Sequence, residues 1–109
     1  MSVATLERID ILLRKLEEYN INGGIVHMQR ILLILYKEIY PFLSQEERLK
    51  GDIIYDQIQK SIKIHGTVCS YELNILEVMN NFDFWIRDKL LEKGLLMSQT
   101  DKLDNIMLQ

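Results

Sequence analysis

Cys69 and His65 come closer than any other residues of the chain to an arrangement that does nucleophilic chemistry. They lie four residues apart, on either side of Gly66 and Thr67. A thiol at the first turn of a helix has a lowered pKa, and a histidine beside it can take up its proton. Such a pair also needs a group that orients the base and a pocket for the substrate, and the sequence marks neither. We therefore expect Cys69 to be a small buried apolar side chain and His65 a cation at a helix end.

Glu72 would extend this pair to three candidate metal ligands. Structural zinc sites normally use four cysteine or histidine ligands, and the chain has one cysteine and two histidines. Gly66 separates His65 from Cys69, so the two need not share a helix face. A di-iron bundle needs Glu-x-x-His pairs, and neither histidine has a glutamate three residues before it. We expect no metal, no cofactor and no catalytic residue, and a small helical enzyme that uses Cys69 and His65 is the second alternative function.

Basic side chains gather at two places that could contact a phosphate backbone. The groups are Lys60, Lys63 and His65 and, nearer the C-terminus, Arg87, Lys89 and Lys93. Nucleic-acid-binding proteins present a basic patch or stripe, whereas here acids such as Asp83, Asp88 and Glu92 are interleaved and the net charge is −3. We expect balanced, solvent-exposed charge at both places, and a nucleic-acid-binding regulator is the first alternative function.

The composition places the chain among single-domain globular proteins. Its 109 residues suit one domain, and 48% hydrophobic with 27% charged residues is ordinary for a packed core with a solvated surface. The chain contains 17 leucines and 15 isoleucines but one alanine, so its core is built of large branched side chains. The sequence has no Gly-rich phosphate loop, no Gly-x-Ser-x-Gly elbow and no Cys-x-x-Cys motif, and no small-molecule substrate is evident.

The expected compartment follows from the cysteine content and from the lack of long apolar runs. A single cysteine excludes a disulfide within the chain and is typical of a reducing compartment. The N-terminal residues lack the charged start and apolar run of a signal peptide. The longest run of aliphatic and aromatic residues, Ile31 to Tyr36, is far too short to cross a bilayer. We expect a cytoplasmic protein, made in its own cell or in the cytoplasm of a host, with no membrane contact.

Four breaks divide the chain into segments with helical periodicity. They lie at residues 20–24, at Pro41, at residues 65–67 and at Gly94. Between these breaks apolar residues recur at steps of three and four, which predicts helices over about residues 3–19, 25–39, 44–65 and 68–93. Ser44 followed by Glu47 predicts a capping box at the start of the third helix. Gly51 within that helix favours a close crossing with a neighbour, since glycine there costs about 1 kcal/mol relative to alanine.

These elements predict an all-α fold, an antiparallel four-helix bundle with a short C-terminal fifth helix or frayed tail. Residues 1–97 form the single bundle domain in this prediction. The tail over residues 98–109 is polar at first, and Leu103, Ile106 and Met107 then recur at helical spacing. Such a tail could pack on the bundle, exchange onto a partner or fray.

The second and fourth predicted helices carry more apolar surface than such a bundle buries. A bundle helix needs an apolar stripe somewhat over about 100° wide, and these two exceed roughly twice that width. Ile34 even interrupts the polar arc of the second helix. One interpretation is a central helix with three neighbours inside the monomer. The other, which we favour, is an intermolecular interface, because monomers rarely leave large apolar patches in water.

The predicted interface is a second apolar stripe on the fourth helix, with Ile34 on the second helix as a further exposed apolar position. It comprises Leu73, Leu76, Asn80, Phe84, Arg87, Leu91 and Ile34. Phe84 is the expected anchor because aromatic side chains dominate interface energetics, and Asn80 and Arg87 would set direction or register. The sequence thus predicts a small non-enzymatic protein–protein interaction module acting as a homodimer. We expect an adaptor, inhibitor or regulator, of the kind that viruses and plasmids encode, with an unidentified protein partner.

Overall fold

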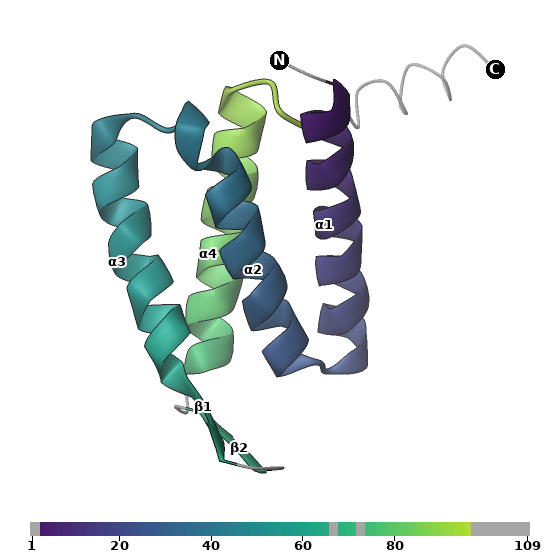
Figure 1. Ribbon diagram of the computed structural model, residues 1–109, viewed down its shortest axis with the longest axis vertical. Helices are drawn as coiled ribbons and strands as arrows, with labels where there is room; N and C mark the ends of the chain where they lie inside the picture. Colours follow the sequence, from purple (N-terminus) through teal and green to yellow (C-terminus); the bar gives the residue numbers. More distant parts are fainter. Residues whose placement is uncertain (1–2, 66–67, 72–73, 97–109) are drawn as a thin grey trace, which may run out of the picture.

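The computed structural model describes the backbone of residues 3–65, 68–71 and 74–96 and the side chains of residues 3–61 and 74–96. Within this part of the chain, four α-helices, one 3-10 helix and a β-hairpin follow one another (Figure 1). In order, they are α1 (Val3–Asn22), α2 (Ile25–Ile39), η1 (Tyr40–Phe42), α3 (Gln45–Ser61), β1 (Ile62–His65), β2 (Val68–Tyr71) and α4 (Ile75–Glu92). The helical bundle expected from the periodicity is confirmed.

Consecutive helices of the bundle alternate in direction, as Figure 1 shows. α2 packs against α1, α3 and α4, whereas α4 packs mainly against α2 and α3. α2 is therefore the central helix, and its neighbours bury Met28, Ile31, Leu32, Leu35, Tyr36 and Ile39. Three neighbours within the monomer account for most of the apolar excess of α2, and Ile34, 41% exposed, lies outside the buried set.

Local sequence signals set where the helices end. Gly23 adopts a φ of +76° after α1 and Gly94 a φ of +67° after α4, a conformation that glycine reaches without steric strain. After α4 the Leu95 N–H donates to the Leu90 carbonyl at 2.8 Å, which closes a Schellman motif. The Leu95 side chain is fully buried, so it anchors the chain where it leaves the helix.

The capping box predicted at the start of α3 is confirmed. The Ser44 N–H donates to Glu47 Oε1 at 2.7 Å, and the Glu47 N–H donates to Ser44 Oγ at 3.2 Å. Upstream, α2 ends at Ile39 as predicted, although Tyr40 before Pro41 keeps right-handed helical geometry and the chain continues directly into η1. Pro41 itself lies in the short η1, whose first turn tolerates its missing N–H.

The core is one continuous cluster of side chains from all four helices. α1 contributes Ile9, Leu13 and Leu16, and α4 contributes Ile75, Met79, Phe82, Ile86 and Leu90. Around Tyr36 lie the rings of Tyr40, Tyr55, Phe82 and Trp85, with centroids between 5.4 and 6.3 Å from its own. The core is therefore aliphatic on the α1 side of α2 and aromatic where α2 meets α3 and α4.

Gly51 lies where α3 crosses α2, and the ring of Tyr36 takes the space of a side chain there. A Cβ atom on Gly51 would lie 2.6 Å from Cζ of Tyr36, well inside van der Waals contact. The Tyr36 hydroxyl donates to Asp52 Oδ1 at 2.8 Å, and burial together with this carboxylate raises the pKa of Tyr36. The close helix crossing expected from Gly51 is confirmed.

The predicted end of the third helix at residue 65 is wrong, and so is the predicted start of the fourth helix at residue 68. The two helices are shorter, and between them β1 and β2 form an antiparallel hairpin that projects from one end of the bundle (Figure 1). Its register pairs Ile62 with Tyr71 and Ile64 with Cys69. Apolar and polar residues alternate along β1 and its apolar residues are β-branched, a pattern that favours a strand. The helical spacing of Ile58 and Ile62 concealed this alternation.

The predicted C-terminal helix or tail over residues 98–109 lies outside the described residues. The division into a bundle domain over residues 1–97 and a separate tail therefore stays a prediction. Among the helices of the described part, none is both long enough and apolar enough to cross a membrane.

Candidate functional site

α4 carries exposed apolar residues at the positions that the sequence placed in an interface. Leu76 is 44% exposed, Phe84 71% and Leu91 68%. Steps of three and four residues bring these side chains onto the same helix face as Asn80 and Arg87. These five residues (Leu76, Asn80, Phe84, Arg87 and Leu91) together form the α4 stripe. It faces away from the core, since Phe82 and Ile86, two positions before and after Phe84, are fully buried.

One edge of the α4 stripe borders α1. Arg87 Nε donates to Asp83 Oδ1 at 2.7 Å, and Arg87 Nη1 lies 3.5 Å from Glu17 Oε1 on α1. Ion pairs at the surface contribute about 0.2–1 kcal/mol each, so their main effect is to hold the guanidinium in one place. The positive charge of the stripe is thereby fixed in position and partly neutralised.

The opposite edge of the α4 stripe is acidic. Glu77, Asn81 and Asp88 are exposed there, at spacings of four and seven residues that keep them on one side of the helix. The stripe therefore has an apolar centre, a rim of negative charge on one side and a paired arginine on the other.

Two residues of the predicted interface are not part of this stripe. Leu73 precedes the first residue of α4, and its side chain lies outside the described part of the chain. Ile34 lies on α2, two positions from the buried Leu32 and Tyr36, so it points away from the side of α2 that packs on α4. Ile34 is a separate exposed apolar position.

Cys69 and His65 lie in the hairpin and not at a helix end. Cys69 is in β2 opposite Ile64, and His65 is the last residue of β1 opposite Val68. The helix terminus expected beside both residues is therefore wrong, and with it the reason for a lowered pKa of the thiol. Their side chains and Glu72 lie outside the described residues. Among the side chains that are described, no group of three His, Cys, Asp or Glu residues could hold a metal ion.

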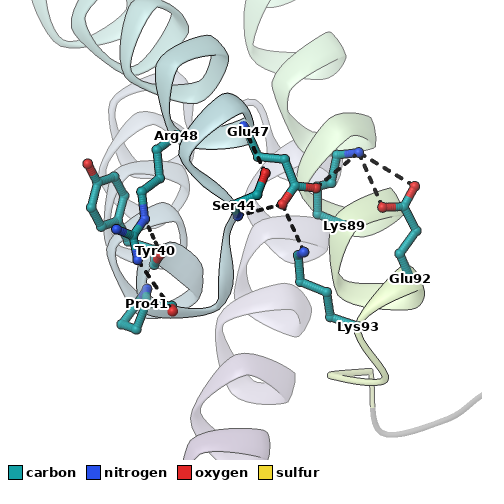
Figure 2. A network of polar contacts seen from close by, with 8 residues as sticks. All are labelled: Tyr40, Pro41, Ser44, Glu47, Arg48, Lys89, Glu92 and Lys93. Atoms are coloured by element: carbon teal, nitrogen blue, oxygen red, sulfur yellow. Dashed lines mark hydrogen bonds and ion pairs between the residues drawn. The ribbon is translucent and has the colours of Figure 1, made fainter.

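A network of polar contacts, the Glu47 clasp, joins the start of α3 to the end of α4 (Figure 2). It consists of Ser44, Glu47, Lys89, Glu92 and Lys93. The Glu47 carboxylate accepts hydrogen bonds from the Ser44 N–H at 2.7 Å and from Lys93 Nζ at 2.8 Å. Lys89 Nζ lies 3.5 Å from Glu47 Oε2 and 3.2 Å from Glu92 Oε2. The clasp thus connects the first turn of one helix to the last turn of another.

Charges within the Glu47 clasp neutralise one another. The hydrogen bond from Lys93 and that from the Ser44 N–H hold the pKa of Glu47 at about 2, below its ordinary 4.5. Burial alone would lower the pKa of Lys89, but its hydrogen bonds to Glu92 and Glu47 raise it. General acids and bases work best with a pKa near the working pH, so these shifts suit an ion pair that holds two helices together.

A crevice of about 430 Å³ beside the clasp is lined by Ser44, Glu46, Glu47, Lys50, Trp85 and Lys89.

The basic residues considered for nucleic-acid contact are paired with acids wherever their side chains are described. Lys60 Nζ lies 2.9 Å from Asp56 Oδ2, Arg87 is paired with Asp83, and Lys89 and Lys93 belong to the Glu47 clasp. The side chains of Lys63 and His65 lie outside the described part. This pairing fits the expectation of balanced surface charge.

Comparison with known protein families, curated proteins and solved structures returns no match, so the function of this chain is inferred from its own residues.

Proposed function

We propose that this protein is a small non-enzymatic protein–protein interaction module, an adaptor, inhibitor or regulator, that acts through the α4 stripe and forms a homodimer there. The observation that carries the proposal is the 71% exposure of Phe84, with Leu91 at 68% and Leu76 at 44% on the same helix face. Single exposed apolar residues are normal on a monomer, whereas several that share one helix face favour an interaction site or an aggregation risk. Phe84 at its centre is the kind of aromatic anchor that dominates interface energetics.

The size of the α4 stripe supports a weak and reversible dimer. The exposed fractions of its three apolar side chains amount to a little under two complete side chains. Full burial of such a side chain stabilises by about 1.5–3 kcal/mol, which gives at most roughly 5–11 kcal/mol when two copies pair. Association loses about 4–15 kcal/mol of translational and rotational freedom. Because the two magnitudes are comparable, we expect a dimer that dissociates on dilution.

The state of the charged groups supports a binding role more than a catalytic one. Beside the crevice, Glu47 and Lys89 are paired within the Glu47 clasp, and on α4 Arg87 is paired with Asp83 and Glu17. The apolar side chains of the stripe, in contrast, are 44–71% exposed.

Substitution of Phe84 with aspartate tests the proposal. Multi-angle light scattering over a range of concentrations should show a wild-type mass that rises toward twice the monomer mass. Phe84→Asp should stay monomeric with unchanged helical circular dichroism, because the side chain is outside the core. Ile53→Asp is the matched control, since Ile53 is also 71% exposed but lies on α3. A monomeric wild type, or a Phe84→Asp variant with the wild-type mass, overturns the proposal.

A further inference from the structure

The α4 stripe has a nearly palindromic order along the helix. Leu76 and Leu91 lie at equal sequence distances from the point between residues 83 and 84, and so do Asn80 and Arg87. Phe84 lies next to that midpoint. A stripe with this order can pair with an identical stripe that runs in the opposite direction, because a two-fold axis makes each residue meet its counterpart on the other copy.

We infer that a second copy of this chain docks on the α4 stripe in antiparallel orientation, about a two-fold axis that passes between residues 83 and 84. The docking geometry rests on the proposed function and specifies how its dimer is built. With a helical rise of about 1.5 Å per residue, Leu76 meets the partner's Leu91 about 11 Å from the axis, and Asn80 meets the partner's Arg87 about 5 Å from it. The two copies of Phe84, the most exposed apolar side chain of the stripe, pack together at the centre.

The polar residues of the stripe favour the antiparallel orientation over the parallel one. A parallel pair would place Arg87 opposite the partner's Arg87, where the free N–H donors of each guanidinium, already paired with Asp83 and Glu17, meet only donors and find no acceptor. In the antiparallel pair Arg87 faces the amide of the partner's Asn80, whose oxygen accepts a hydrogen bond from a guanidinium. Arg87 uses Nε for Asp83 and Nη1 for Glu17, and a guanidinium has five N–H donors, so donors remain for the amide.

The acidic edge of the stripe gives the self-pairing a distinctive salt dependence. Glu77 and Asp88 are almost symmetric about the same midpoint, so in the antiparallel dimer Glu77 of each copy lies near the partner's Asp88. Added salt screens this repulsion between exposed carboxylates, while the apolar contact at the centre persists. The dimer therefore tightens as ionic strength rises. A basic protein partner docked on the same acidic edge would instead be released by salt.

Cysteine cross-linking tests the orientation. In a Cys69→Ser background, the single-cysteine variants Asn80→Cys and Arg87→Cys are oxidised with oxidised glutathione, each alone and as an equimolar mixture. Mass spectrometry of the disulfide-linked peptides should find the mixed 80–87 disulfide in several-fold excess over the 80–80 and 87–87 disulfides. Ile53→Cys, equally exposed on α3, is the control for random collision. An excess of the 80–80 and 87–87 disulfides overturns the antiparallel arrangement.

A pair of charge variants provides a second measurement that does not need a disulfide. Asn80→Asp places a carboxylate opposite the partner's Arg87, and a charge-assisted hydrogen bond formed twice should lower the dimer Kd by about tenfold. Asn81→Asp makes the same chemical change on the acidic edge and should raise the Kd. Equal effects of the two variants overturn the docking geometry while leaving a dimer in place. If light scattering finds wild type monomeric at every concentration and salt, the proposed function fails together with the geometry.

Discussion

Replacement of Gly51 with alanine probes the close crossing of α2 and α3. The added Cβ would lie 2.6 Å from Cζ of Tyr36, whereas packed carbon atoms prefer about 3.5–4.0 Å. The ring must therefore retreat by roughly 1 Å or α3 must move away. Retreat is restricted, because the rings of Tyr40, Tyr55, Phe82 and Trp85 surround Tyr36 and its hydroxyl is bonded to Asp52.

The expected effect is a balance of three magnitudes. Alanine in a helix interior is about 1 kcal/mol more favourable than glycine. Overpacking a filled site costs about 1–3 kcal/mol, and loss of the hydrogen bond between Tyr36 and Asp52 adds about 0.5–1.5 kcal/mol. We therefore expect Gly51→Ala to lower the free energy of unfolding by about 1–3 kcal/mol in spite of the better helix propensity.

Urea denaturation followed by circular dichroism measures this change, and a second background isolates its cause. In Tyr36→Leu the ring is absent, so Gly51→Ala should there raise the free energy of unfolding by up to about 1 kcal/mol. The reversal of sign between the two backgrounds is the signature of a clash with Tyr36. A stabilising effect of Gly51→Ala in the wild-type background, or the same loss in both backgrounds, would refute the assignment of the crossing to this contact.

Two further predictions concern the Glu47 clasp and the two sides of α4. The pKa of Glu47 is lowered to about 2 in the folded chain, so its carboxylate stabilises the fold above about pH 4.5 and this contribution is lost as the pH falls toward 2. Its side chain is 17% exposed, so after solvent screening we expect the free energy of unfolding to fall by about 1–2 kcal/mol over this pH range. Glu47→Gln retains the capping hydrogen bonds but not the charge, and urea denaturation from pH 6 to pH 2 should show a flatter pH dependence of its unfolding free energy. A wild type whose stability falls no more steeply than that of Glu47→Gln would contradict the clasp. On α4, Phe82→Ala should lower the unfolding free energy by about 3–5 kcal/mol, because Phe82 is fully buried. Phe84→Ala, measured at a concentration where the chain is monomeric, should change it by less than about 0.5 kcal/mol. Similar losses in the two variants would mean that Phe84 is covered within the monomer.

The positions of the helices could be predicted because their signals are local. The periodic apolar residues of α2 and the break at Pro41 marked its two ends, although Tyr40 before the proline is still helical, and Ser44 with Glu47 marked the start of α3. The hairpin was missed because Ile58 and Ile62 continue a helical step, while the alternation along β1 is only four residues long. Over four residues the helical periodicity and the strand periodicity cannot be told apart. The pairing with β2 decides between helix and strand, and it depends on residues later in the chain.

The candidate site was predictable only in part, for a physical reason. The α4 stripe follows from spacing, because a helix fixes which residues share a face. The sequence shows an excess of apolar residues on both α2 and α4. Spacing alone could not show that α2 has three neighbouring helices, which bury most of its apolar surface. The contact between Glu47 and Lys93 joins helices that are separated by the hairpin, and a pairing of surface charges over that distance has no signal in one sequence.

The up-and-down order of the helices also shapes how the chain folds as it is made. α1 contacts α2 and α2 contacts α3, so most helix pairs join neighbours in the sequence, and such low contact order is typical of fast folding. α2 nevertheless needs α4, which arrives last. From the end of α2 at Ile39 to the end of α4 at Glu92, synthesis takes roughly 3–10 s at about 5–20 residues per second. During that interval one apolar side of the central helix stays uncovered on the ribosome, and it is there that the nascent chain is most open to chaperones or to misassembly.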